Sequence, residues 1–169
     1  MVLSNKNAKV AVVMGSDSDL STMQSCVDIL KDFGVEVEVR IISAHRTAVA
    51  AAEFADGAEG AGIKVIIAAA GMAAHLAGSL AGRTKLPVIG VPMQAGEGPY
   101  GLDALLSTVQ MPPGVPVGCM AIGKAGAKNA AVFAVEILAL SDSGLGAKLD
   151  EFRKNQSEKV MAKDKEVRG

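Results

Sequence analysis

The sequence predicts an α/β fold built on a parallel sheet, and three observations support this class. Apolar runs of strand length alternate along the chain with segments of helical spacing. Two runs, residues 9–14 and 64–70, are continuously apolar after an initial lysine, as in strands covered on both faces. The first three runs end at Met14, Ile42 and Ala70, so both intervals are 28 residues. One strand-helix unit per interval brings the three following turns to the same edge of the sheet.

The remaining strands are less uniform. Residues 35–42 at first alternate apolar and charged side chains, so one face of this strand should meet solvent or the strand should lie near the sheet edge. Residues 87–91 and 117–122 supply a fourth and a fifth strand. In the order 2-1-3-4-5, the turns after the first and third strands flank the crevice in which open parallel sheets bind ligands.

Helical segments fill the intervals between the strands. Apolar residues repeat at helical spacing from Leu20 to Leu30, and the pattern stops at Gly34, a favoured residue just past a helix end. Asp19 is well placed as the N-cap of this helix. Further helices are expected over residues 48–59, 75–83, 102–109 and 127–140.

The helix over residues 127–140 is apolar nearly all round, whereas the surface helix of a monomer should carry a polar face. A second buried face therefore favours oligomerisation. The tail that follows sets Leu145, Leu149, Phe152 and Val160 among charged residues. This pattern predicts an amphipathic helix that docks on its own core or on a neighbouring subunit.

Composition limits the class of protein. A chain of 169 residues with 50% apolar and 21% charged residues suffices for one domain with a sizeable core. Its 17 basic and 18 acidic residues leave a net charge of −1, and aromatic residues make up 3% of the chain. This balance disfavours nucleic acids and membranes as partners, and so few aromatic rings provide no stacking platform for single strands.

Cysteine usage and the first residues predict a cytoplasmic protein. Cys26 and Cys119 fall in different predicted elements and form no CxxC pair, as is typical of thiols in a reducing compartment. Residues 1–7 contain no apolar segment of the kind that a secretory signal carries. No later run reaches the roughly 20 uncharged residues that a membrane-spanning helix needs.

Small and polar residues occupy the three turns at the predicted sheet edge. These turns are residues 15–19 (GSDSD), 43–47 (SAHRT) and 71–76 (GMAAHL). Small residues let the backbone approach a ligand closely, and helix N-termini direct N–H groups at an anion. The first turn is neither a GxxxxGK[ST] loop nor a GxGxxG fingerprint, which argues against an ATPase or a dinucleotide enzyme. A small molecule that carries a phosphate is the expected ligand.

The side chains of these turns suggest how such a ligand is held. Ser16 and Ser18 can donate to phosphate oxygens, whereas Asp17 and Asp19 would repel them, so one aspartate is expected to accept from sugar hydroxyls instead. Arg46 offers a planar fork for the phosphate. Plainer roles are open for two of these residues: Asp19 as a helix cap alone and Arg46 as half of a surface ion pair.

Both histidines of the chain, His45 and His75, lie in these turns. We expect His45 to carry protons, because an imidazole both gives and takes a proton near neutral pH. A structural role for either residue is the alternative. A metal site is disfavoured because the chain has no HxH or HExxH spacing, and serine acyl transfer because it has no GxSxG elbow.

At these turns the chain resembles the N5-carboxyaminoimidazole ribonucleotide mutases of purine biosynthesis, also called phosphoribosylaminoimidazole carboxylase catalytic subunits. The resemblance spans roughly residues 10–140. It includes four ordered motifs, at residues 15–19, 43–47, 73–76 and 107–117. Four motifs at matching spacing are far more specific than any one of them.

The resemblance implies a flavodoxin-like sheet over residues 1–142, with residues 143–169 as the tail of the same domain, and a homo-octamer. It also implies an isomerase that moves a carboxyl group from the exocyclic nitrogen of aminoimidazole ribonucleotide to a ring carbon, with neither ATP, metal nor other cofactor. The same resemblance implies a role for each turn residue. The phosphate region is held by Ser16, Ser18, Ser43, Ala44 and Arg46, and the ribose by Asp17 and Asp19. The base and its carboxyl group are held by Gly71, His75 and Leu76, and protons are shuttled by His45.

Two rival functions are open. The related carboxylases, which use CO2 directly, usually carry Lys at the position of Arg46 and lack the stretch at residues 73–76, so Arg46 and His75 favour the mutase. A ribonucleotide-binding module without catalysis is the other. The chain departs from the usual family pattern at Leu20, Ala48, Met72 and Ala77, where Trp, Pro, Gly and Pro are common.

Overall fold

Five parallel strands form a sheet in the computed structural model, which describes residues 4–96 and 98–169. The strands are β1 (Val10–Met14), β2 (Val37–Ile41), β3 (Val65–Gly71), β4 (Val88–Met93) and β5 (Gly118–Cys119). Their order is β2-β1-β3-β4-β5, so the predicted fold class and strand order are confirmed. Met14 pairs with Ile41 on one side and with Ala69 on the other. The first three strands therefore end level with one another.

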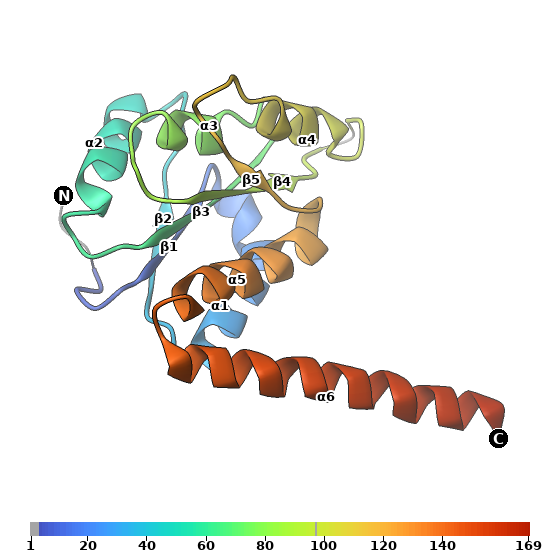
Figure 1. The fold of residues 1–169 in the computed structure, drawn as a ribbon. Helices are drawn as coiled ribbons and strands as arrows, with labels where there is room; N and C mark the ends of the chain where they lie inside the picture. Colours follow the sequence, from blue (N-terminus) through green and yellow to red (C-terminus); the bar gives the residue numbers. More distant parts are fainter. Residues whose placement is uncertain (1–3, 97) are drawn as a thin grey trace.

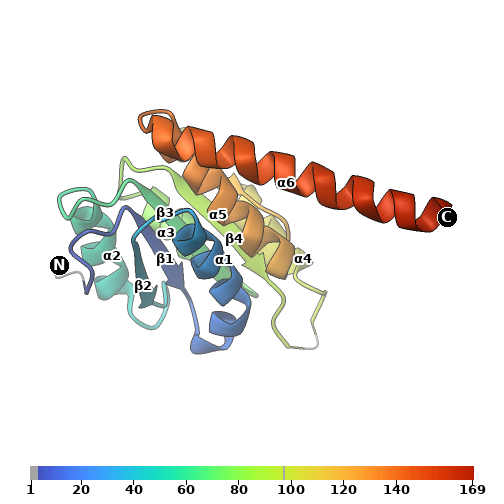
Figure 2. The same cartoon turned by 90° about the horizontal axis from the view of Figure 1, so that it is seen from below.

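Helices cover both faces of this sheet, which gives three layers (Figures 1 and 2). On one face lie α1 (Leu20–Asp32) and α5 (Gly123–Ala139), and on the other lie α2 (Ala48–Ala58), α3 (Leu76–Ala81) and α4 (Leu102–Val109). A short 3-10 turn, η1 (Asp17–Asp19), precedes α1, and α6 (Ser143–Arg168) packs outside α5. The long α6 runs past the edge of the body in both views.

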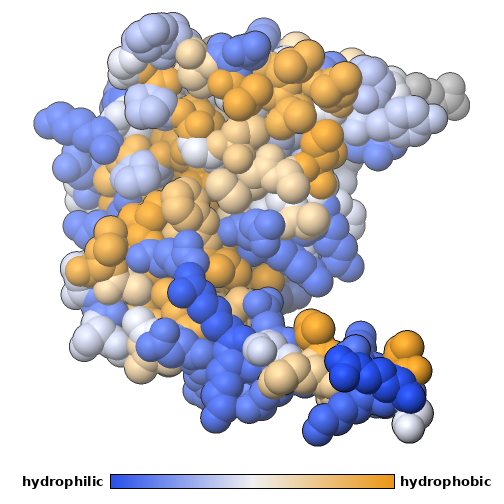
Figure 3. Space-filling model, turned by 45° about the vertical axis from the view of Figure 1, so that its right-hand side comes forward, coloured by the Kyte–Doolittle hydropathy of each residue, from blue (hydrophilic) through white to orange (hydrophobic). Residues whose placement is uncertain are grey.

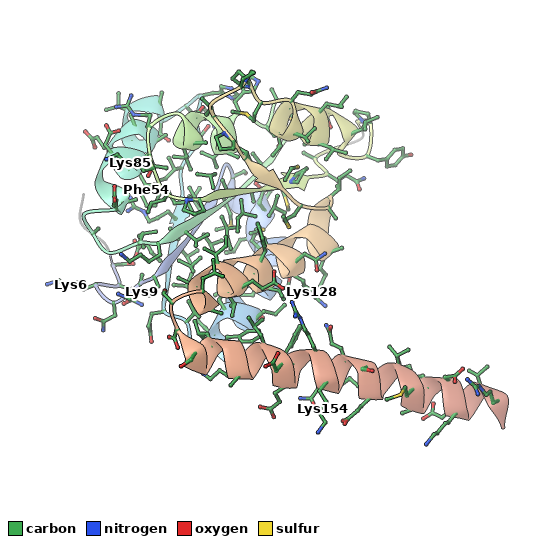
Figure 4. All side chains as sticks on the ribbon, viewed as in Figure 1. Lys6, Lys9, Phe54, Lys85, Lys128 and Lys154 are labelled. Atoms are coloured by element: carbon green, nitrogen blue, oxygen red, sulfur yellow. The ribbon has the colours of Figure 1, made fainter. Side chains whose placement is uncertain are left out.

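The central strands are buried because both of their faces meet helices. Every residue of β1 is buried, with its side chains alternating between the core under α1 and α5 and the core under α2 and α3. Phe54 is 2% exposed and lies between α2 and the sheet (Figure 4). Each large apolar side chain buried in this way contributes about 1.5–3 kcal/mol to the free energy of unfolding.

The strand β2 lies at the sheet edge, as its alternating pattern indicated. In a simple half-buried strand the apolar side chains are buried and the charged ones exposed. Here Glu38 is fully buried, while Val39 and Ile41 are 36% and 54% exposed. The Glu38 carboxylate accepts hydrogen bonds from Ser4 Oγ (2.7 Å) and from the backbone N–H groups of Ser4 and Asn5 (3.2 and 3.0 Å). The buried carboxylate thus ties the segment before β1 to the edge strand.

The predicted helical tail is a 26-residue helix, of which only the first part packs on the body. Leu149 is buried, and the rings of Phe33 and Phe152 lie 5.4 Å apart. Arg153 Nη2 donates to Glu136 Oε1 at 2.7 Å, which links α6 to α5. Val160, in contrast, is 68% exposed, so the amphipathic pattern docks on this chain's own core only in its first half.

The predicted helix at residues 127–140 begins earlier and is covered differently than expected. It starts at Gly123, where glycine and alanine give no apolar periodicity to read. Its second apolar face is covered in part by α6 of the same chain, with Ile137 and Leu138 packed against the core. The face that suggested a partner subunit is therefore covered only in part within the chain, since Phe133 and Leu140 are 38% and 89% exposed.

The last strand is much shorter than the sequence pattern predicts. The strand expected over residues 117–122 is reduced to Gly118–Cys119, since it pairs with β4 alone and the chain must then turn into α5.

Across the described residues, none of the helices combines the length and the apolar character that crossing a membrane requires.

Candidate active site

The turns that follow β1, β2 and β3 enclose a cavity of about 470 Å³. They lie side by side because the three strands end level in the parallel register. A volume of this size is typical of sites for small organic ligands. Of the eleven site residues predicted from the sequence, all line the cavity except Asp17.

The first turn is organised by its own hydroxyl groups. Ser18 Oγ donates to Ser16 Oγ at 2.9 Å, and Ser16 Oγ donates to Asp17 Oδ1 at 3.1 Å. Ser16 Oγ also accepts from the backbone N–H of Ser18 at 3.3 Å and so caps η1. Asp17 therefore holds a cavity-lining serine in place although its own side chain is exposed and outside the cavity lining.

Asp19 does not act as the helix cap that the sequence suggested. It occupies the N-cap position of α1, but its backbone is helical (φ −81°, ψ −14°) and its side chain makes no capping hydrogen bond. The side chain instead lines the cavity and is 7% exposed. Burial raises the pKa of the Asp19 carboxyl, a hydrogen bond from the Ser16 backbone opposes this rise, and the charge of Asp17 adds to it.

The second turn is closed by Thr47 and presents Arg46 to the first turn. Thr47 Oγ1 accepts from the Ser43 N–H and donates to the Ser43 carbonyl, both at 2.9 Å. The backbone N–H of Arg46 donates to Ser43 Oγ at 3.1 Å. The guanidinium reaches across the edge of the sheet, where its Nη2 donates to the Gly15 carbonyl at 3.3 Å. Arg46 thus places a positive charge between the turns after β1 and β2.

The two histidines meet in the cavity. His45 Nε2 lies 2.8 Å from His75 Nδ1, and the two rings are arranged edge to face with centroids 5.0 Å apart. Both histidines are exposed, and both line the cavity. Of the two facing nitrogens, one must donate and the other accept, because a neutral imidazole carries one of each. The hydrogen bond therefore couples the tautomer of His45 to that of His75.

The third turn forms the apolar end of the cavity. Gly71 is required by close packing: a Cβ at this position would lie 2.8 Å from Ala95 Cβ and 3.1 Å from the Met93 carbonyl oxygen. Leu76 is 2% exposed and begins α3 beneath the cavity. Met72 has a left-handed backbone (φ 55°) and is 64% exposed. The first two turns thus line the cavity with serines and Arg46, whereas the third lines it mainly with apolar residues.

Sequence reasoning left out five residues of the cavity lining: Gly15, Ala70, Met72, Ala73 and Ala95. Gly15, Met72 and Ala73 lie within the predicted turns and Ala70 directly precedes the third, so their position in the sequence was a usable signal. Ala95 follows β4, and no pattern in the sequence shows that this segment folds back onto Gly71. Among residues 4–96 and 98–169, no group of three or more His, Cys, Asp or Glu side chains is arranged to hold a metal ion.

Comparison with known proteins gives consistent results for the chain as a whole. The family model described as AIR carboxylase matches residues 9–159. A protein of Brucella melitensis named N5-carboxyaminoimidazole ribonucleotide mutase is 54% identical over 151 residues, which are 89% of this chain and 93% of that protein. A protein of the same name from Escherichia coli K12 is 50% identical over 93% of this chain and 92% of its own length.

A solved structure agrees with these sequence matches. The crystal structure of Treponema denticola PurE superposes with a TM-score of 0.83 at 28% identity, covering 93% of this chain and 96% of that one. The sheet order, the cavity at its edge and these matches point to the same conclusion. The chain belongs to the AIR carboxylase family.

Proposed function

We propose that this protein is an N5-carboxyaminoimidazole ribonucleotide mutase that acts in purine biosynthesis. The observation that carries the proposal is that His45 lines one cavity together with Arg46 and the serines of the first two turns, and lies 2.8 Å from His75 of the third turn. The proteins of Brucella melitensis and Escherichia coli described above, at 54% and 50% identity, carry this name and support the same reaction.

The proposed reaction is an isomerisation in two steps. The bond between the exocyclic nitrogen and its carboxylate breaks, CO2 leaves, and the nitrogen keeps the electron pair and takes a proton. The ring carbon then attacks the CO2, a new carbon–carbon bond forms, and the proton on that carbon is removed. Confinement of both fragments makes their recombination effectively unimolecular, which supplies much of the catalysis.

His45 is the proposed proton carrier for both proton transfers. It would deliver a proton on the side of the leaving nitrogen and take one from the ring carbon, so one group serves both steps. His75, within 2.8 Å of His45 Nε2, would orient the imidazole and contact the base with its carboxyl group. One histidine pair then provides both proton transfer and orientation.

The remaining cavity residues are proposed to bind the substrate. Arg46, Ser16, Ser18, Ser43 and Ala44 would hold the phosphate region, since a guanidinium fork and hydroxyl donors suit phosphate oxygens.

The sugar and the base are assigned to the other predicted residues. Asp19 would accept from the ribose hydroxyls, and Asp17 would act on the ribose side by holding Ser16 through the hydrogen bond to its Oγ. Gly71 and Leu76 would contact the base.

We also propose an assembly of identical subunits, an octamer, with residues 1–142 as the catalytic part and residues 143–169 as its tail. Apolar surface on the face that carries α4 supports association (Figure 3). There Leu102, Leu106 and Val109 form a helical stripe and are each about half exposed. A cytoplasmic location fits a phosphorylated substrate, which does not cross membranes freely.

The proposal is tested by giving the purified protein either of two substrates and following the ring-carboxylated product. The mutase predicts rapid conversion of N5-carboxyaminoimidazole ribonucleotide without added bicarbonate. Faster turnover of aminoimidazole ribonucleotide with bicarbonate would instead show a carboxylase. Binding of the ribonucleotide without conversion of either substrate would show a binding module.

A further inference from the structure

Met72 occupies a backbone conformation that its side chain disfavours. Its φ of 55° lies in the left-handed region, where the Cβ of an L-residue crowds the backbone and glycine is the usual choice. Its side chain is also 64% exposed, so little burial offsets this strain. Strained residues of this kind persist where the surrounding structure imposes them, and they gather at ligand sites.

The structure on both sides of Met72 explains how the turn is held. Gly71 passes so close to Met93 and Ala95 that no side chain fits there. On the other side, Ala74 is 1% exposed and anchors the turn in the core. Met72 is fixed between these two contacts and contributes to the cavity lining. Tyr100, the other non-glycine residue with a positive φ in the described chain, does not line the cavity.

Met72 lies at the end of the cavity that suits an aromatic base. Ala70, Ala73, Leu76 and Ala95 line the cavity near it, whereas Arg46 belongs to the charged end. A methionine side chain is flexible and polarisable, and its sulfur packs favourably against the edges of aromatic rings. An exposed thioether at this position has the reach and the chemistry to close over a flat ring.

We propose that Met72 closes the apolar end of the cavity over the imidazole ring of the bound ribonucleotide and slows the escape of CO2. This inference rests on the proposed mutase function and adds a residue to it. CO2 is small, uncharged and held by no ionic contact, so its retention depends on walls that exclude solvent. Met72 takes no part in bond making; it contacts the substrate and limits exchange with water.

Oxidation of methionine by hydrogen peroxide tests the contact directly, with Met161 as an internal control. Met161 is 54% exposed on α6, comparable to Met72, and lies outside the cavity lining. In the free protein both should be oxidised at similar rates. Saturating aminoimidazole ribonucleotide should slow sulfoxide formation at Met72 several-fold and leave Met161 unchanged, as measured by peptide mass spectrometry.

Two oxidation results would overturn the proposal. Equal rates at Met72 with and without the ribonucleotide would show that the ligand does not cover it. Slow oxidation of Met72 in the free protein, relative to Met161, would show that a neighbouring copy covers it instead.

Retention of the carboxyl carbon tests the second half of the proposal. Wild type, Met72→Leu and Met72→Gly receive substrate labelled with 13C in the carboxyl group, in unlabelled bicarbonate with carbonic anhydrase present. Met72→Gly should lose several-fold more label to solvent per product formed, whereas Met72→Leu, of similar size, should resemble wild type. Equal retention in all three proteins would refute the role of Met72 while leaving the mutase intact. No product from the wild type would refute the mutase itself.

Discussion

His45 Nε2 and His75 Nδ1 lie 2.8 Å apart, so two turns that follow different strands share one hydrogen bond between side chains that line the cavity. The residues are 30 positions apart in the sequence, and they meet because β2 and β3 flank β1 and end level with it. The nitrogen of His45 in this bond is within reach of a ligand in the cavity. If a substrate replaces His75 as the hydrogen-bond partner of His45, it meets an imidazole that is already oriented.

Replacement of His45 by Asn should reduce kcat between about 100- and 10,000-fold, the usual contribution of a positioned general acid-base group. The affinity for aminoimidazole ribonucleotide should change by no more than a few-fold, because Arg46 and the serines remain. Turnover, calorimetric binding and circular dichroism measure the three quantities. Near wild-type turnover in a folded variant that binds the ligand would exclude His45 as the proton carrier.

Replacement of His75 separates orientation from proton transfer. His75→Leu removes the hydrogen bond to His45, and we expect kcat to fall about two- to tenfold, the kinetic equivalent of one ordinary hydrogen bond. His75→Asn can place an amide atom near the position of Nδ1 and should recover part of that loss. If the two variants have equal kcat and identical pH profiles, His75 does not orient His45.

Arg46→Ala tests the charged end of the cavity. Loss of a hydrogen-bonded charge on a phosphate should raise KM about 10- to 100-fold with little change in kcat. Arg46→Lys keeps the charge without the planar fork and should give an intermediate KM. Steady-state kinetics on both variants measure the effect. A fall in kcat at unchanged KM would assign Arg46 to the chemical step instead.

Much of this architecture could be predicted from the sequence, because buried parallel strands are recognised as apolar runs that end at turns of small residues. The ends of β1, β2 and β3 at Met14, Ile41 and Gly71 lie within one residue of the predicted ends. The strand order was also predicted. The end of β5 was not, because an edge strand with one partner has no sharp limit in its pattern.

The cavity itself was predictable only as far as its turns. Sequence position identified the turn residues, but whether a side chain enters the cavity depends on local torsion angles. Asp17 and Asp19 look equivalent in the sequence, yet η1 exposes the first and buries the second. The contact of Ala95 with Gly71 depends on the path of the loop after β4, which no periodicity encodes.

Glu38 should make stability depend on pH. Burial alone would raise the pKa of its carboxyl, but hydrogen bonds from Ser4 and Asn5, together with the charge of Arg40, outweigh it and hold the pKa below its ordinary value. A carboxyl group with a lowered pKa in the folded state stabilises the fold above the pKa of the unfolded chain. This contribution is lost as the pH falls through the folded pKa.

The variant Glu38→Gln should therefore lower the free energy of unfolding by about 1–3 kcal/mol at pH 7, as expected for disturbed hydrogen bonds to a buried group. The difference from wild type should shrink as the pH falls below the ordinary pKa of a glutamate, about 4.3, because the unfolded chain then takes up a proton more readily than the folded one. Urea unfolding across this range measures it. Glu53→Gln, at an exposed position on α2, is the control and should show no such trend. A constant difference at all pH values would contradict the assignment.

The fate of the carboxyl carbon shows whether the protein confines CO2 between the two steps of the reaction. Wild-type protein is given N5-carboxyaminoimidazole ribonucleotide labelled with 13C in the carboxyl group, in excess unlabelled bicarbonate, and the product is analysed by mass spectrometry. A mutase that confines CO2 predicts a ring-carboxylated product that keeps most of the label. A product carrying unlabelled carbon in proportion to the bicarbonate pool would contradict the account.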